Sequence, residues 1–200
     1  MQKQNIIDEF IKAKALLKGH FILSSGLHSD TYMQCARVLM DAKKADKLCA
    51  TLADKLIAKL GNNFADIIVS PAMGGVVVGY EMGRQLNLPA IFCERVEGKF
   101  QLRRGFEIFE NARVLVVEDV ITTGKSSLET FECIRSYGGK IVAECSLVDR
   151  SDKDKDIEDV LGVSVISLLD IDIKTFDKNN VPEELRNIEA IKPGSRFIKK

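Results

Sequence analysis

The sequence predicts an α/β fold in which helices flank a central, mostly parallel sheet. From residue 66 onward, segments that are apolar on successive residues alternate with helical segments, as in parallel sheets whose strands are covered on both faces. In addition, 200 residues that are 46% hydrophobic and include only four prolines suffice for one compact domain. We therefore expect a single domain over residues 1–200, with an N-terminal part at about 1–40, a core at about 41–170 and a closing segment at 171–200.

Two helices and a hairpin are expected before the sheet begins. Apolar residues recur at helical spacing over residues 4–18. They do so again between Asp41, a good N-cap, and Gly61, a typical C-terminal stop. Between these helices, residues 19–38 alternate around a Ser25-Gly26 turn, which predicts a short β-hairpin.

The rest of the chain supplies the sheet and its covering helices. Five apolar runs are predicted strands, at residues 66–70, 90–93, 113–117, 140–148 and 162–168. Helices are expected up to about Leu86 and from about Lys125 to Tyr137. A charged connector at 151–159 and a short closing segment at 181–197 complete the prediction.

Charge and cysteine content exclude several classes of protein. Twenty-nine basic residues balance twenty-nine acidic ones, so no overall field attracts nucleic acid or an anionic membrane. Five scattered cysteines and two histidines form neither a disulfide framework nor a zinc motif. The longest uncharged run, residues 67–80, is too short to span a membrane, and the N-terminus lacks the apolar core of a signal peptide. We expect a cytoplasmic protein with no nucleic-acid or membrane partner.

A phosphate-binding loop is predicted where the strand at 113–117 ends. Two carboxylates, Glu118 and Asp119, follow the strand, and a loop rich in hydroxyls then opens a helix. Backbone N–H groups at a helix N-terminus suit a phosphate monoester, and carboxylates suit ribose hydroxyls or a metal carried by the ligand. A nucleotide P-loop is excluded, because the glycine it requires five residues before Gly124 is Asp119. The simpler alternative is an acidic pair that only caps the strand.

The pattern of four hydrophobic residues, two acids, two hydrophobic residues and Thr-Thr-Gly resembles the phosphoribosyl pyrophosphate motif of type I phosphoribosyltransferases. With GHFILSSGLHSDTYMQ, PAMGG, ERVEGKFQLRRGF and SLVDR, nearly the whole chain resembles the orotate phosphoribosyltransferases. The resemblance implies a type I phosphoribosyltransferase fold with a small N-terminal hood and a mobile loop. It also implies transfer of a phosphoribosyl group to orotate in de novo pyrimidine (UMP) biosynthesis, Mg²⁺ carried by the substrate rather than bound directly by the protein, and a homodimer with shared active sites.

The resemblance also assigns residues to the pyrophosphate donor. The donor-binding residues implied are Arg95, Lys99, Glu118, Asp119, Val120, Ile121, Thr122, Thr123, Gly124, Lys125 and Ser126. Residues 94–106 carry four cations and predict a mobile basic loop, for which a solvated surface loop is the alternative. A lysine on a closing lid can stabilise the charge of departing pyrophosphate, so Lys99 and Asp119 are the expected catalytic residues. The resemblance places this loop over the neighbouring subunit's site.

Orotate carries a carboxylate, and a guanidinium can pair with both of its oxygens. Arg150, at the end of the strand SLVD, matches the family residue for this role, and Thr122 matches a second orotate contact. Tyr32 and Met33 match the wall over the pyrimidine, although on their own they indicate ordinary core.

PAMGG, residues 71–75, matches the pyrophosphate loop, or is a plain turn. Four positions depart from common family residues: Ser24, Gly74, Val96 and Gln101.

Two other functions stay open at this point. A purine phosphoribosyltransferase would share the donor motif, but the N-terminal hairpin and Arg150 argue against it. A regulator that senses the donor without turning it over would need a DNA-binding appendage, and neither end carries a basic extension.

Overall fold

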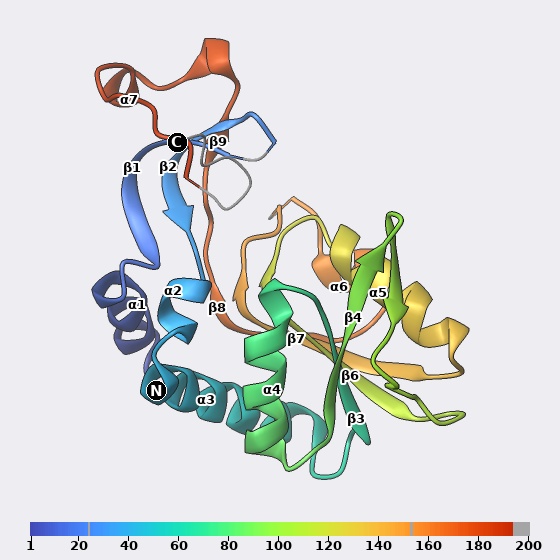
Figure 1. The fold of residues 1–200 in the computed structure, drawn as a ribbon. Coiled ribbons are helices and arrows are strands. Elements are labelled where there is room, and N and C mark those ends of the chain that lie inside the picture. The colour runs from blue at the N-terminus through green and yellow to red at the C-terminus, as the bar shows by residue number, and fades with distance from the viewer. Residues whose placement is uncertain (24, 153, 194–200) are drawn as a thin grey trace.

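The computed structural model describes residues 1–23, 25–152 and 154–193, and its main feature is a six-stranded sheet (Figure 1). The strand order is β5-β4-β3-β6-β7-β8, and only the β4–β5 pair is antiparallel. The strands are β3 (Ile67–Pro71), β4 (Ala90–Val96), β5 (Lys99–Leu102), β6 (Arg113–Ile121), β7 (Lys140–Asp149) and β8 (Val165–Asp170). The predicted α/β class with a mostly parallel sheet is confirmed.

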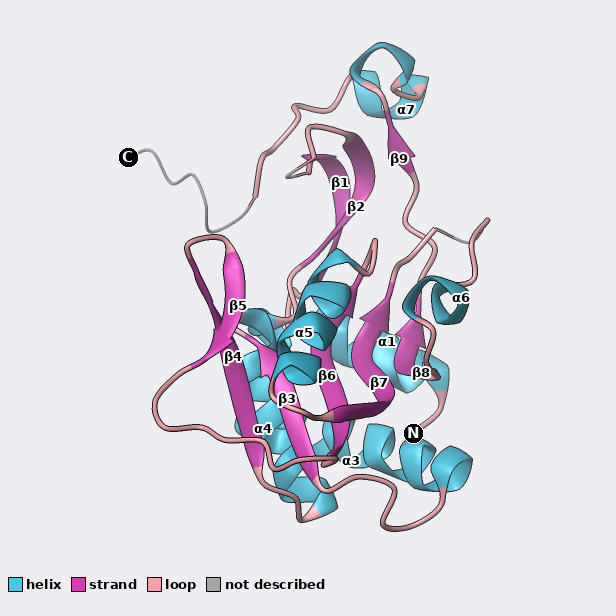
Figure 2. Cartoon of the chain, turned by 90° about the vertical axis from the view of Figure 1, so that its right-hand side faces the viewer, coloured by secondary structure: helices cyan, strands magenta, loops and turns pink. Residues whose placement is uncertain are grey.

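Helices cover both faces of this sheet, which explains the continuous apolar runs. Along β6, Val114 and Val116 belong to one core cluster, whereas Leu115 and Val117 belong to the other. The first cluster packs under α5 (Lys125–Ser136) and α6 (Ile157–Leu161), and the second under α3 (Ala42–Leu60) and α4 (Gly74–Leu86). Figure 2 shows α5 in front of the sheet and α3 and α4 behind it.

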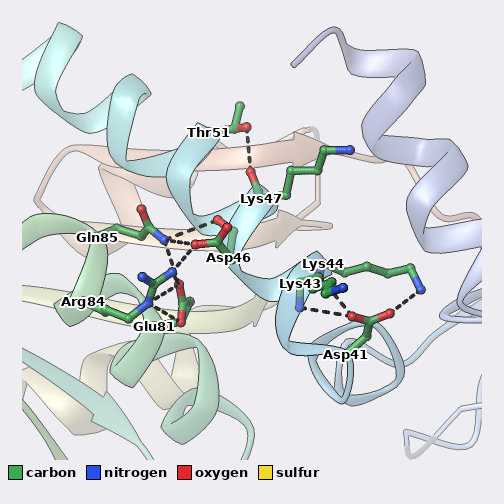
Figure 3. Close-up of polar contacts among 9 residues, drawn as sticks. All are labelled: Asp41, Lys43, Lys44, Asp46, Lys47, Thr51, Glu81, Arg84 and Gln85. Carbon is green, nitrogen blue, oxygen red and sulfur yellow. Dashed lines mark hydrogen bonds and ion pairs between the residues drawn. The ribbon is translucent and has the colours of Figure 1, made fainter.

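The helix α3 lies where its caps predicted it. The Asp41 carboxylate accepts hydrogen bonds from the backbone N–H groups of Lys43 and Lys44, at 3.1 and 3.3 Å (Figure 3). Gly61 ends the helix with φ of 82°, a left-handed conformation that favours glycine.

A second, three-stranded sheet forms the hood above the main sheet (Figure 1). The hairpin predicted over residues 19–38 is present, but it starts and ends earlier, as β1 (Leu16–Ile22) and β2 (His28–Met33). The strand β9 (Thr175–Phe176) pairs with the other edge of β2. On the free side of β1, the backbone of Ile191 exchanges hydrogen bonds with Ile22 and His20, each 2.9 Å long. The hood is therefore built from both ends of the described chain.

Two buried histidines connect the hairpin to the C-terminal segment. Nδ1 of His20 lies 2.9 Å from the carbonyl oxygen of Ile188, and a carbonyl only accepts, so this nitrogen carries the hydrogen. Nε2 of a neutral His20 then accepts from Nδ1 of His28, 2.6 Å away. His28 is thus a structural residue of the hood.

The expected helix over residues 4–18 is too long. Helix α1 (Lys3–Lys12) ends at Lys12, and Lys14 adopts a positive φ of 53°. Leu16 and Leu17, whose spacing suited a helix, pair with Met33 and Tyr32 as the start of β1. Gly19, the residue after the expected helix, lies within β1 where the register shifts.

The segment 94–106 is more regular than the basic loop that the sequence predicted. Its first part is a hairpin, in which β4 continues through Val96 and turns at Glu97 and Gly98 into β5. Phe100 and Leu102 face the core while Lys99 and Gln101 face out, so a period-two pattern supports the strand.

The remaining short elements were not predicted. They are α2 (Ala36–Leu39), α6 within the charged connector, the 3₁₀ turn η1 (Lys178–Asn180) and α7 (Glu183–Arg186). The strand predicted at 162–168 is β8, which starts later, at Val165, because Gly162 ends α6. Within the described ranges, no helix is both long enough and apolar enough to cross a membrane.

Candidate active site

A cavity of about 740 Å³ lies between the hood and the carboxyl ends of β6 and β7. It gathers seven residues that the sequence singled out from three separate segments. These residues are Tyr32, Met33, Asp119, Val120, Thr122, Thr123 and Arg150. Carboxyl ends of parallel strands are the usual ligand-binding edge of open α/β sheets.

The acidic pair lies within the last part of β6, which continues to Ile121, beyond the predicted strand at 113–117. Asp119 lines the cavity, and Glu118 is buried beside it. Burial raises the pKa of Glu118 to about 9, and the nearby charges of Asp119 and Glu144 add to this effect. Burial also raises the pKa of Asp119 above its ordinary value. A buried carboxyl group beside a half-buried one that lines the cavity favours a ligand that donates hydrogen bonds to them.

The start of α5 supplies the predicted phosphate loop. Gly124 has φ of 73°, and a Cβ built on it would lie 2.9 Å from Cδ2 of Leu161, so both backbone and space require glycine. Among the first N–H groups of α5, only that of Lys125 bonds to a side chain within the described residues, where it donates to the Thr123 hydroxyl at 3.4 Å. Its first N–H groups and the adjacent Thr122 and Thr123 can therefore hold an anion. Lys125 and Ser126 begin the helix itself.

Val120 and Ile121 complete the segment that links the acids to the loop. Both belong to β6 and pair with Val148 and Asp149 of β7. Val120 lines the cavity, whereas Ile121 is buried. This pairing with β7 fixes the positions of the acidic pair and of the loop that follows it.

Arg150 is held in the cavity by its backbone, which leaves its side chain available. Its N–H group donates to the carbonyl oxygen of Ile121, at 3.0 Å. Burial lowers the pKa of the guanidinium, and the Arg150 charge acts on the Tyr32 phenol across the cavity. Among the ion pairs of the described residues, none involves Arg150. A half-buried cation of this kind suits a ligand carboxylate.

The basic hairpin lies outside this cavity. Arg95 stacks over Phe100, 4.3 Å from the ring centre, and forms an ion pair with Glu129 of α5. Arg104 pairs with Glu94 at 2.7 Å. Lys99 is exposed and does not line the cavity of its own chain. The structure thus brings Arg95 and Lys99 onto one hairpin without placing either in the cavity.

The loop at 71–75 packs against the end of β6. A Cβ built on Gly75 would lie 3.0 Å from the carbonyl oxygen of Val117, and one on Gly74 would lie 2.7 Å from the Asp119 carboxylate. These contacts place the predicted pyrophosphate loop directly beside the acidic pair. Ser24 lies outside the described residues.

Sequence reasoning missed several residues of the site. The connector after β7 contributes Ser151, Asp152, Lys155, Ile157 and Val160 to the cavity wall. Their position just after a strand end was the available signal, since such loops line ligand sites.

Two further residues around the acidic pair were also missed. Cys35 lies behind Asp119, with its Sγ 3.7 Å from the Asp119 carbonyl oxygen. Glu144 is a lone acid within the apolar run of β7.

Comparisons with known proteins agree with this geometry. The family described as "Phosphoribosyl transferase domain" matches residues 38–185. Orotate phosphoribosyltransferase of Sphingopyxis alaskensis is 54% identical over 198 residues, which cover 99% of each chain. That of Bartonella henselae is 46% identical over 198 residues, covering 99% of this chain and 100% of the relative.

Solved structures show the same arrangement. The orotate phosphoribosyltransferase from Aeropyrum pernix superposes with a TM-score of 0.67 at 26% identity, over 82% of this chain and 93% of that chain. With a family match over most of its length and full-length relatives near half identity, this chain belongs to the orotate phosphoribosyltransferase family.

Proposed function

We infer that this chain transfers the phosphoribosyl group of 5-phosphoribosyl 1-pyrophosphate to orotate, giving orotidine 5′-monophosphate and pyrophosphate, a step of pyrimidine biosynthesis. The observation that carries this inference is a single cavity that joins Asp119, Thr122 and Thr123 to the guanidinium of Arg150, which forms no ion pair within the described residues. Full-length relatives are named for this activity, and they do not favour a purine substrate or a sensing role.

The donor is proposed to lie along the end of β6. The N–H groups at the start of α5 hold its 5′-phosphate, and Thr122 and Thr123 add hydroxyl donors. Glu118 and Asp119 accept hydrogen bonds from the ribose hydroxyls, which draws both carboxyls toward their ionised form. Their negative field then stabilises positive charge that develops on the ribose ring as the bond from C1′ to pyrophosphate breaks.

Orotate is proposed to occupy the side of the cavity nearest the hood. Arg150 pairs with its carboxylate, and Thr122 adds a hydrogen bond. Tyr32 and Met33 form an apolar wall against the ring, which excludes water from the new bond between the ring nitrogen and C1′. Orientation by Arg150 brings that nitrogen to the carbon that pyrophosphate leaves.

Mg²⁺ is proposed to enter with the pyrophosphate donor. Phosphate oxygens and water are the ligands that this ion prefers. In the ranges that the structure describes, no three His, Cys, Asp or Glu side chains gather where they could hold a metal. In this proposal the donor's own oxygens hold the ion, which would neutralise part of the leaving group's charge.

A homodimer is proposed to complete the site. Three apolar side chains of α4 and its N-cap project into solvent at helical spacing: Met73, Val77 and Tyr80, which are 83%, 49% and 71% exposed. Near its C-terminal end, α4 is linked to α3 by Arg84 and Gln85, which both bond to Asp46 (Figure 3). A rigid helix with an apolar outer face beside the pyrophosphate loop suits a second copy of this chain. Lys99 would then serve the partner's site.

A cytoplasmic location is also proposed. All five cysteines are described, buried and free. Unpaired thiols suit a reducing compartment.

The test is a substrate comparison. The protein is incubated with the donor and Mg²⁺ against orotate, adenine, hypoxanthine or uracil, and pyrophosphate release is followed. Release with orotate alone is expected, and it should stop when a chelator removes Mg²⁺. Release with adenine or hypoxanthine but not orotate would contradict the function, and donor binding without any release would favour a sensor.

A further inference from the structure

Glu144 is a fully buried carboxyl group that the proposed mechanism does not use. It lies in β7 with no exposed surface. Its Oε1 accepts a 2.7 Å hydrogen bond from Oγ of Ser127, and within the described chain its Oε2 is buried without a partner. Burying a carboxyl oxygen without a partner costs stability, so its presence calls for a physical reason.

The position of Glu144 connects the two halves of the donor site. In the parallel pairing of β6 with β7, Val116 is opposite Glu144 and Glu118 is opposite Ser146. Paired residues point to the same face of a sheet, and so do residues two apart on one strand. Glu144 therefore lies on the same face as Glu118, beside Val116, which precedes Glu118 by two residues. Its hydrogen-bond partner, Ser127, is in the first turn of α5, the turn that presents N–H groups to the phosphate.

We propose that Glu144 is a positioning residue for the pyrophosphate donor: it anchors the first turn of α5 through Ser127, and its charge state sets how readily Glu118 ionises behind the ribose. This inference rests on the proposed function. Glu144 touches no substrate in this arrangement and acts through Ser127 and Glu118.

The surroundings of Glu144 define how its charge acts. Burial raises its pKa to about 7, so both protonation states occur near neutral pH. The titratable groups that its charge reaches are Glu118 on β6 and Cys145 on its own strand. Its contact from α5 is the neutral Ser127 hydroxyl, and the side chains linking β7 to β8 are the hydroxyls of Ser146 and Ser167.

The direction of the effect of Glu144 on Glu118 follows from the like negative charges of the two carboxylates. An ionised Glu144 raises the pKa of Glu118, so Glu118 accepts ribose hydroxyls less readily as pH rises through the Glu144 transition. Glu144→Gln removes this charge at every pH and keeps an oxygen that can accept from Ser127. Glu118 should therefore ionise at a lower pH in that variant.

The experiment measures donor affinity by calorimetry with Mg²⁺ from about pH 6 to about pH 9. The proteins are the wild type, Glu144→Gln, Ser127→Ala and Glu132→Gln, the last neutralising an exposed carboxylate of the same helix. For Glu144→Gln we expect an affinity profile shifted to lower pH by about half a unit. For Ser127→Ala we expect donor affinity about five- to tenfold weaker at every pH, without a shift. Glu132→Gln should match the wild type.

A purely structural role would give another pattern. Glu144→Gln and Ser127→Ala would then lower the melting temperature while both affinity profiles overlay the wild type, and this result would overturn the proposal. Product assays on the wild type separate this failure from that of the proposed function. If the wild type forms orotidine 5′-monophosphate while the profiles overlay, only the role of Glu144 is lost.

Discussion

Gly74, the first residue of α4, lies so close to Asp119 that a Cβ atom on Gly74 would be 2.7 Å from Oδ1 of the carboxylate. Gly74 has no positive φ, so space rather than backbone conformation calls for glycine here. The end of β3 and the end of β6 therefore share one contact, and a side chain at residue 74 must displace the carboxylate.

Gly74→Ala should reduce turnover about tenfold while the melting temperature changes little, because a carboxylate at the end of a side chain can rotate away. Gly75→Ala is the matched control. Its Cβ would meet the backbone oxygen of Val117, which cannot rotate, so it should lower the melting temperature instead. Steady-state kinetics and thermal unfolding of both variants measure the contrast. Equal turnover in Gly74→Ala and the wild type would remove Asp119 from its assigned position.

Arg150→Ala should weaken the use of orotate by about 2–4 kcal/mol of transition-state stabilisation, because a charge-assisted pair is lost from a half-buried site. Donor affinity should not change. The measurement is kcat/KM for orotate together with donor binding. Arg103→Ala, which removes an exposed cation, is the control and should keep wild-type efficiency. Near-native kcat/KM in Arg150→Ala would show that orotate binds elsewhere.

A shared site predicts complementation between two inactive variants. Lys99→Ala and Asp119→Asn should each lose about 10² to 10³ in turnover, because each removes one charge that stabilises the transition state. When equal amounts are unfolded and refolded together, half the dimers are mixed, and one of the two sites in each mixed dimer is intact. Activity should return to about a quarter of the wild type. A mixture no more active than its parents would mean that Lys99 serves its own chain.

Tyr80→Asp should dissociate the proposed dimer, because it places a charge in the exposed apolar face of α4. Light scattering should report half the mass of the wild type, and turnover should fall with it, since Lys99 no longer reaches the partner's cavity. Ile11→Asp makes the same change at another exposed apolar residue and should leave mass and turnover unchanged. A dimeric, active Tyr80→Asp protein would place the interface on another surface.

Glu118→Gln should stabilise the free protein at alkaline pH. The folded pKa of about 9 lies above the ordinary value of 4.5, so between these values the unfolded chain releases a proton that the folded chain retains. Stability attributable to this group is therefore complete below about pH 4.5 and is lost as pH rises toward 9.

Thermal unfolding can measure the Glu118→Gln effect directly. The variant should gain about 1–3 kcal/mol at alkaline pH and little in acid, at the expense of turnover. Glu132→Gln, on the exposed face of α5, should show no such pH dependence. A gain that is the same in acid and in alkali would point to packing rather than charge.

The parts of the fold that could be predicted are those that local chemistry determines. Asp41 and Gly61 cap α3 as their side-chain and backbone preferences require, and the apolar run of β6 led directly to the acidic pair. By contrast, Leu16 and Leu17 fit a helical pattern but belong to β1, because pairing with β2 outweighs their spacing. Whether Leu16 and Leu17 form a helix or a strand depends on β2, which their own spacing does not reveal.

The candidate active site likewise contains residues that could be predicted from the sequence and residues that could not. Arg150, at the end of a strand, was found through the family resemblance, which also supplied its role. Glu144 was not found, because a single acid in an apolar run does not reveal which helix will supply its partner. Lys155 was missed because its connector was interpreted from its charge alone, although its place after a strand end could have indicated a cavity wall.

The hood determines the order in which the site can be completed during synthesis. His20 bonds to a carbonyl 168 residues later, and β2 receives its outer partner only at Thr175. The strands of the parallel sheet and the acidic pair all come before residue 171, so they leave the ribosome before the segment that completes the hood. The hairpin that carries Tyr32 must wait for residues 174–191 before both its edges are paired. A nascent chain therefore acquires its phosphate loop before it acquires a finished wall for the pyrimidine ring.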